Sequence, residues 1–201
     1  MVLLSKRQVA ELTAASSRAL VIYAHPRHQT SRACRQLLAA ISDLDEVTIR
    51  DLYEEYPDFH INIGHEQSLL RNHQLVIFLF PLYWYSAPSL LKEWQDRVLN
   101  FALDEVPGRA GPEQDPLQGR MLWIATSVGA SFSSFSAEGG NRYPLEQYLL
   151  PYEQTARVCR MAWQTPFMVC QARRKPESVL QRQAQSFRSI LLGKLQALDN
   201  A

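Results

Sequence analysis

Short apolar stretches alternate along this chain with longer segments in which apolar residues recur at helical spacing. We expect strands at the five apolar stretches, over residues 19–24, 47–52, 75–80, 121–125 and 167–170. Four of them are continuously apolar, which is typical of parallel strands covered by helices on both faces. The stretch 47–52 carries polar positions and therefore favours an edge strand.

The segments between these stretches predict helices. Apolar residues at positions i, i+3, i+4 and i+7 occur within 34–41, 91–101, 148–159 and 180–195, and a short helix is expected over His65–His73. Strands and helices that alternate with right-handed crossovers form an open parallel sheet. We therefore predict an α/β fold, a flavodoxin-like three-layer sandwich around a five-stranded parallel sheet of order 2-1-3-4-5.

Length and composition fit one globular domain. The 201 residues suffice for one such sheet, and we assign 1–18 to an N-terminal extension and 19–201 to the domain. The net charge of +1 argues against a nucleic-acid partner. Three cysteines without CxxC spacing indicate free thiols in a reducing compartment. Without a signal-peptide core or a run of about 18 apolar residues, a cytoplasmic protein is expected.

Ligands of such sheets bind beyond the carboxyl ends of the strands, which directs attention first to HPRHQTSRA after the first strand. His25 ends the strand, Pro26 opposes its continuation, and Thr30 or Ser31 is placed to cap the next helix. A helix start facing the strand ends is an anion site. The alternative is that Ser31 only caps and His25 only closes a turn.

Two further loops offer flat and polar surfaces. Tyr83, Trp84 and Tyr85 follow the third strand, where a flat ring such as a flavin has room to rest on them, although Trp84 alone also suits a plug of the core. After the fourth strand, TSVGASFSS offers hydroxyl groups and Gly129 to the polar edge of a ring. Such serine-rich loops are also common as plain solvent-facing turns.

Other chemistries find little support in the sequence. The segment Gly129–Ser133 lacks the second glycine of a GxSxG serine-hydrolase elbow. The histidines do not show the HxH or HExxH spacing of metal ligands. We interpret them as solvated or capping residues: His25, His28, His60, His65 and His73. The cluster Arg173–Lys175 is interpreted as solvated charge, with a phosphate or an acidic partner as the alternative.

Four segments carry a resemblance to a known family: YAHPRHQTSRA, DLYEEYPDFHINI, FPLYWYSAPSLLKEWQDRVL and NRYPLEQYLLPYEQTARVCRMAW. Over about Leu20–Leu192 the chain resembles the NAD(P)H:quinone oxidoreductase family of flavodoxin-like proteins. Within it, the chain resembles the ancillary proteins of glutathione-regulated Kef potassium-efflux systems, in the KefG-like branch.

The resemblance implies bound FMN, with FAD in more distant relatives, and NAD(P)H as electron donor. It places the phosphate on the first loop, at His25, Ser31, Arg32, Ala33 and Cys34. It places the flavin ring on Leu82, Tyr83, Trp84 and Tyr85, with its polar edge on Thr126, Ser127, Val128 and Gly129. No catalytic acid and no metal ligand is carried over.

Three departures from the family pattern keep two functions open. Cys34 stands in place of Asn, Val128 in place of Gly, and FALDEVPG (101–108) in place of an aromatic-Ala-Tyr-Gly segment. The first function is a regulatory subunit of a Kef potassium-efflux transporter that also reduces a quinone or similar electrophile. The alternative is a non-enzymatic regulatory module with a vestigial flavin site. The resemblance further implies a homodimer, peripheral on the cytosolic face of the inner membrane through the transporter.

Overall fold

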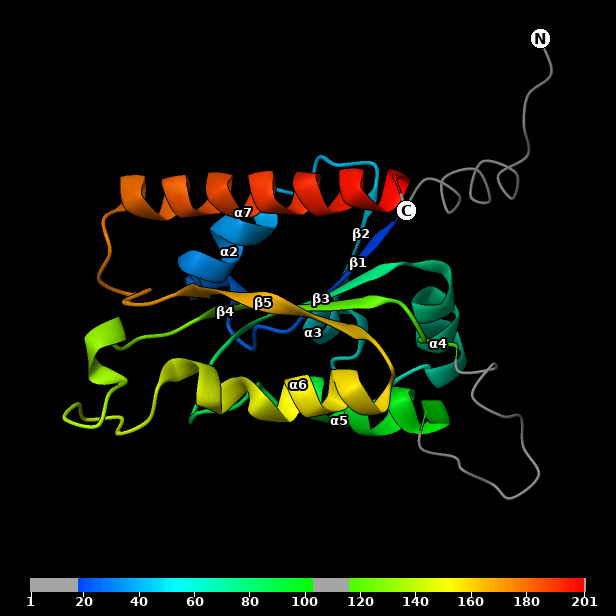
Figure 1. Ribbon diagram of the computed structural model, residues 1–201, viewed down its shortest axis with the longest axis horizontal. Coiled ribbons are helices and arrows are strands. Elements are labelled where there is room, and N and C mark those ends of the chain that lie inside the picture. The colour runs from blue at the N-terminus through cyan, green and yellow to red at the C-terminus, as the bar shows by residue number, and fades with distance from the viewer. Residues whose placement is uncertain (1–17, 103–115, 201) are drawn as a thin grey trace, which may run out of the picture.

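Five parallel strands form one sheet at the centre of the protein, in a computed structural model that describes residues 18–102 and 116–200 (Figure 1). The strands are β1 (Ala19–Tyr23), β2 (Val47–Asp51), β3 (Leu75–Pro81), β4 (Met121–Ser127) and β5 (Ala162–Val169). Their order is β2-β1-β3-β4-β5, which confirms the predicted order and the edge position of the second strand. The predicted extension, 1–18, falls outside the described residues except for Arg18.

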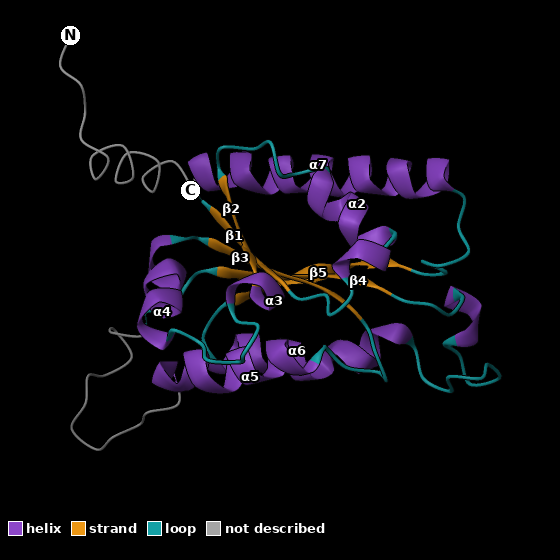
Figure 2. Ribbon diagram, turned by 180° about the vertical axis from the view of Figure 1, so that it is seen from behind, coloured by secondary structure: helices purple, strands orange, loops and turns teal. Residues whose placement is uncertain are grey.

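Helices cover both faces of this sheet (Figure 2). They are α2 (Ala33–Ala39), α3 (Leu52–Glu55), α4 (Ile63–Asn72), α5 (Ser89–Val98), α6 (Leu150–Val158) and α7 (Glu177–Asp199). Short 3-10 turns are η1 (His28–Thr30), η2 (Leu99–Ala102), η4 (Phe132–Ser134) and η5 (Leu145–Leu149). One buried cluster joins α2 and α7 to the sheet, and a second joins the other helices to its opposite face. The three-layer sandwich is therefore confirmed.

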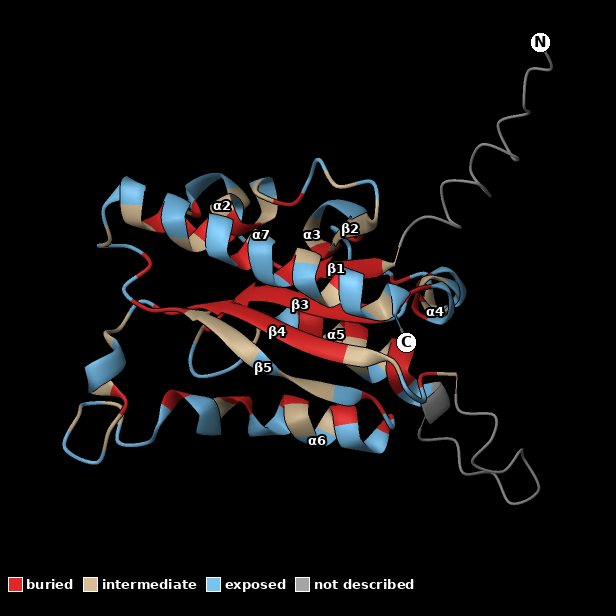
Figure 3. Ribbon diagram, turned by 45° about the horizontal axis from the view of Figure 1, so that its top comes forward, coloured by how far each residue is buried: buried red, intermediate tan, exposed pale blue. Residues whose placement is uncertain are grey.

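The degree of burial explains which strands could be predicted from the sequence. All residues of β1 and β3 are buried, whereas β5 is partly exposed along most of its length (Figure 3). β5 begins at Ala162, earlier than the predicted 167. The prediction missed its first half because Gln164, Thr165 and Pro166 interrupt the apolar run. The register of β4 and β5 shifts between Trp123 and Ala125, beside Pro166, which has no N–H to donate. An edge strand tolerates such a proline.

Candidate functional site

Three loops meet at the carboxyl edge of the sheet, at the left of Figure 1. They follow β1, β3 and β4, the strands that lie side by side in the sheet. The amide of Leu82 donates to the carbonyl oxygen of Ser127 (2.8 Å), and the rings of His25 and Tyr83 meet edge to face, 6.0 Å between centroids. The structure thus brings together the three segments that the sequence singled out.

His25 stands at the base of the first loop as a neutral donor. It is 5% exposed, and its Nδ1 accepts a hydrogen bond from the amide of Arg27 (3.1 Å). Burial, reinforced by the nearby His28, lowers the pKa of His25 to about 4. The imidazole is therefore neutral at pH 7 and carries its proton on Nε2, where it can donate to an anion.

The predicted cap of α2 is wrong, and this correction strengthens the anion site. Arg32 occupies the N-cap position and no side chain caps the helix, while the Thr30 hydroxyl donates to the carbonyl oxygen of Arg27 (3.2 Å). The first amides of a helix have no acceptor within it. At α2 these N–H groups, on Ala33 and Cys34 among others, are left for a ligand beside the buried Ser31.

The Arg32 side chain turns away from the first loop. Its guanidinium donates to the carbonyl oxygen of Arg173 (2.8 Å) and pairs with the carboxylate of Glu177 (3.2 Å) at the start of α7. Arg173 and Arg174 are exposed, in line with the solvated charge expected there. Arg32 is therefore placed to join two loops through its side chain and to offer an anion its backbone.

Cys34 links the first loop to the third. Its side chain is fully buried, and its Sγ lies 3.1 Å from Oγ of Ser127 at the end of β4. Burial raises the pKa of the Cys34 thiol to about 12. The thiol therefore stays protonated at neutral pH and serves as a hydrogen-bonding group of the site's floor.

The aromatic loop is a strained, solvent-facing turn. Tyr83 and Ser86 exchange backbone hydrogen bonds of 2.9 and 3.0 Å around Trp84 and Tyr85, whose φ angles are 49° and 65°. Two successive positive φ values define a type I′ turn, which favours Asn and Gly. Trp84 is 93% exposed, so it does not plug the core. Leu82 is buried below the turn.

A second aromatic group supports the turn from the long loop after β4. Tyr85 stacks on Tyr148, 5.0 Å between ring centroids, and its hydroxyl donates to Oδ1 of Asn141 (3.2 Å). Tyr143 and Phe135 meet Tyr148 edge to face. The sequence predicted Tyr148 on a helix face, and it lies in η5, but it offered no signal for Phe135, Asn141 or Tyr143, because the long loop lacks a repeating spacing.

The polar edge expected after β4 is already partly occupied. The Thr126 hydroxyl donates to the carbonyl oxygen of Phe80 (2.9 Å), and the amide of Val128 donates to the carbonyl oxygen of Val169 (2.8 Å). Gly129 is exposed. Ser127 and Gly129 are thus the members of this segment best placed to meet a ligand.

Two histidines differ from the sequence interpretation. His28 is half-buried and its Nδ1 lies 2.9 Å from the hydroxyl of Tyr23, while His73 is buried between Thr48 and the carbonyl oxygen of Leu69. Both were interpreted as solvated or capping residues. A sequence signal existed for His28 only, because it lies in the loop that carries His25.

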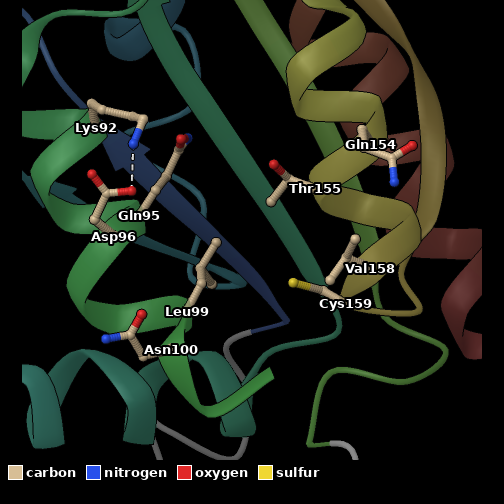
Figure 4. A pocket seen from close by; sticks show the side chains of 9 residues that line it. All are labelled: Lys92, Gln95, Asp96, Leu99, Asn100, Gln154, Thr155, Val158 and Cys159. Carbon is tan, nitrogen blue, oxygen red and sulfur yellow. Dashed lines mark hydrogen bonds and ion pairs between the residues drawn. The ribbon is translucent and has the colours of Figure 1, made fainter. Parts of the chain in front are cut away.

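A cavity of about 380 Å³ lies elsewhere, between α5 and α6 (Figure 4). Its lining mixes an exposed ion pair, Lys92 with Asp96, with amide side chains and the apolar Leu99 and Val158. It contains none of the predicted site residues. The carboxyl edge remains the candidate site, because buried titratable groups and a strained turn gather there.

Across residues 18–102 and 116–200, the structure holds no helix with the length and apolarity that a membrane crossing needs.

Comparison with known proteins places these loops in a family context. A family model described as the flavodoxin-like fold matches residues 17–191. The glutathione-regulated potassium-efflux system ancillary protein KefG of Erwinia tasmaniensis is 42% identical over 168 residues, covering 84% of this chain and 89% of the relative. The KefG protein of Yersinia enterocolitica is 44% identical over 178 residues, covering 88% and 93%.

Solved structures agree on the fold and differ in name. General stress protein 14 of Treponema denticola in complex with FMN has a TM-score of 0.78 at 30% identity, covering 90% of this chain and 99% of that one. An NADPH-quinone reductase from P. pentosaceus scores 0.73 at 30% identity, covering 86% and 96%. A structure described as a thermophilic tryptophan halogenase scores 0.78 at 34% identity, covering 86% and 98%, so fold likeness alone does not fix the reaction. The matched residues and the KefG identities together assign this chain to the flavodoxin-like fold family that includes the KefG ancillary proteins.

Proposed function

We propose that the protein is an ancillary regulatory subunit of a glutathione-regulated potassium-efflux system and carries an FMN-dependent NAD(P)H:quinone oxidoreductase site. The observation that carries the proposal is the meeting of three loops at one sheet edge, one with anion donors and one with exposed aromatic rings. The relatives named KefG support the regulatory role. The FMN complex and the NADPH-quinone reductase support the flavin chemistry.

The donor set of the first loop fits a phosphate ester. His25 offers a neutral imidazole N–H, Ser31 a hydroxyl, and the uncapped start of α2 its free amides at Ala33 and Cys34. A single phosphate is enough to use these donors, which favours FMN over FAD. The ring would then lie toward Leu82, the turn of Tyr83, Trp84 and Tyr85, and the segment Thr126–Gly129.

Bound FMN would accept two electrons as hydride from NAD(P)H and deliver them to a quinone or a similar electrophile. The chain's own residues bind and orient. The loop after β1 holds the phosphate, the aromatic turn walls the ring, and Cys34 with Ser127 closes the floor between them. Positioning of this kind is a large part of catalysis when donor and acceptor must meet in sequence.

The exposed surface around the candidate site also suggests how the protein assembles with partners. Trp84, Phe132 and Tyr143 are large aromatic side chains that stay 93%, 61% and 51% exposed near the site. Exposed apolar groups of this size mark interaction surfaces. The proposal therefore includes a homodimer built on these loops and a peripheral place on the cytosolic face of the inner membrane, where the transporter is the partner.

Purification of the full chain tests the enzyme directly. We expect a yellow protein with a flavin absorption band, or a colourless one that binds added FMN, and NAD(P)H oxidation when a quinone is supplied. A protein that takes up no FMN at micromolar concentrations would overturn the flavin proposal. A Leu150→Ser variant, changed at an exposed position outside the three loops' contacts, serves as a folded control.

The non-enzymatic module is the second candidate, and particular contacts favour it. The Thr126 hydroxyl and the Val128 amide are satisfied inside the protein, and Cys34 replaces the Asn of the family pattern. This candidate predicts restored potassium efflux in cells lacking the subunit even when Ser31→Glu blocks the phosphate loop by charge. Loss of efflux with Ser31→Glu, in a variant that still folds, would favour the enzyme.

A further inference from the structure

Tyr23 and the half-buried His28 form a hydrogen-bonded pair of titratable residues at the first loop, and this pair has no part in the function proposed so far. Tyr23 ends β1 and is fully buried, and its hydroxyl lies 2.9 Å from Nδ1 of His28. The two rings meet edge to face, 5.5 Å between centroids. When the phenol is the donor of this hydrogen bond, Nε2 is the ring nitrogen of the histidine that carries the proton.

The phenol of Tyr23 is able to act as the donor because it keeps its proton. Burial, with smaller contributions from Cys34 and Asp51, raises the pKa of Tyr23 far above its usual range, so the hydroxyl is protonated at pH 7. A protonated phenol can donate to Nδ1 of His28, and in that arrangement the imidazole proton lies on Nε2. Nε2 lies across the ring from Nδ1, and within the described residues it has no hydrogen-bond partner.

The same arrangement occurs twice in this loop. Nδ1 of His25 accepts from the amide of Arg27, and with Tyr23 as the donor to His28 both histidines present an Nε2–H group. The carbonyl oxygen of His28 accepts from the amide of Ser31 (2.9 Å), which ties His28 to the turn that opens α2. One loop therefore carries two imidazole donors beside an uncapped helix start.

We propose that His28 is a further phosphate-binding residue of this loop and that Tyr23 is the positioning residue that presents its Nε2–H as the donor. The inference rests on the proposed FMN site. Asp51 is the register partner of Tyr23, and its carboxylate accepts from the amide of Tyr53 (3.1 Å). Asp51 is thus held at the end of β2 by its own partner.

Two amide substitutions separate binding from packing. In His28→Asn, the side-chain oxygen stands near the place of Nδ1 and can keep the Tyr23 hydrogen bond, but nothing replaces Nε2–H. In His28→Gln, the side-chain N–H₂ reaches the place of Nε2. Tyr23→Phe removes only the hydroxyl and frees His28 to take either tautomer.

The experiment compares FMN with riboflavin, which lacks the phosphate, by fluorescence titration of the full chain. We expect His28→Asn to weaken FMN about tenfold, the usual effect of losing a hydrogen bond to a charged group, and to leave riboflavin unchanged. His28→Gln should recover most of the FMN affinity. Tyr23→Phe should lower FMN affinity by about two- to fivefold, because part of the population would carry the wrong tautomer.

Two outcomes would overturn the inference, and they are distinct from failure of the flavin site itself. Equal losses for FMN and riboflavin in His28→Asn would mean that the pair only packs the loop. Unchanged FMN affinity in His28→Asn would remove His28 from the site. If the wild-type protein binds FMN no more tightly than riboflavin, the phosphate site of the proposed function is wrong and this inference falls with it.

Discussion

Single residues at the strand ends combine burial with a fixed hydrogen-bonding role. His25 and Tyr23 lie near the same strand end, and each has its titration moved by loss of contact with water. The two pKa shifts are opposite in direction, because burial lowers the pKa of His25 and raises that of Tyr23, but both groups stay neutral. The edge of the sheet thus presents donors without formal charge beneath exposed arginines.

The neutral state of His25 makes stability depend on pH. Its folded pKa of about 4 lies below the ordinary value of 6.5, so the unfolded chain binds the proton first as pH falls. The free energy of unfolding should fall between pH 6.5 and pH 4, by about 3 kcal/mol from this group. Urea unfolding at pH 7 and pH 5 should show about 2 kcal/mol of this loss, because the window between these values covers only part of the titration. His25→Asn, which keeps an acceptor for Arg27 and does not titrate, should lose less stability over this range.

Glu66 contributes to stability as a buried carboxyl group whose two oxygens both accept hydrogen bonds from neighbouring side chains. It is fully buried and accepts from Tyr56 (2.7 Å), Trp94 (2.9 Å) and Arg50 (2.9 Å). Glu66→Ala leaves Tyr56 and Trp94 without this acceptor and Arg50 with Glu55 alone, and should lower the free energy of unfolding by about 3–5 kcal/mol. The exposed Glu54→Ala is the control, expected within about 0.5 kcal/mol of wild type. A loss below about 1 kcal/mol for Glu66→Ala would contradict this account.

At the scale of elements, the aromatic turn exposes the side chains of Trp84 and Tyr85 on a strained backbone, which lowers the stability of the protein. Trp84 and Tyr85 hold left-handed backbone angles that favour Asn and Gly. Trp84→Asn should raise the free energy of unfolding by about 1 kcal/mol, because it relieves this strain and removes an almost fully exposed ring. Thermal unfolding measures the gain. Phe132→Asn, exposed but outside the positive-φ positions, should bring no comparable gain.

FMN affinity should fall, whereas stability rises, when Trp84 is replaced. If Trp84 contacts the flavin ring, Trp84→Ala lowers FMN affinity by about fivefold, the equivalent of about 1 kcal/mol of ring contact. Unchanged FMN affinity with a gain in stability would leave the strained turn to partner binding. The two measurements together decide whether the strain serves the cofactor or an interface.

The elements that the sequence predicted well are those whose burial is uniform. Continuous apolarity located β1 and β3, and helical spacing located α5 and α7, because each buries one whole face or both. The prediction missed the start of β5 because an edge strand needs no continuous apolar run. It missed α3 because four residues are too few to show helical spacing. The site loops were placed by topology. Their contacts were not, since the Tyr85–Tyr148 stack and the uncapped start of α2 depend on tertiary packing.

At the scale of the whole molecule, the chemistry concentrates at one edge of the sheet. The loops of three neighbouring strands meet there, while the cavity between α5 and α6 is lined by none of their residues. If the protein meets an electrophile as proposed, it can do so at a cofactor site or at a reactive thiol. The distribution of cysteines separates these two routes.

All three cysteines of the chain are buried, at 0%, 2% and 8% exposure for Cys34, Cys159 and Cys170. Burial also raises the pKa of Cys34 and Cys170, and a protonated thiol is a poor nucleophile. Titration of the native protein with a chromogenic disulfide at neutral pH should therefore label no thiol within minutes, and all three in denaturant. A single rapidly labelled thiol would place electrophile sensing on a cysteine, with Cys170 the first to examine because it is the most exposed. Protection of all three would argue against a reactive thiol and would support the proposed site at the carboxyl edge.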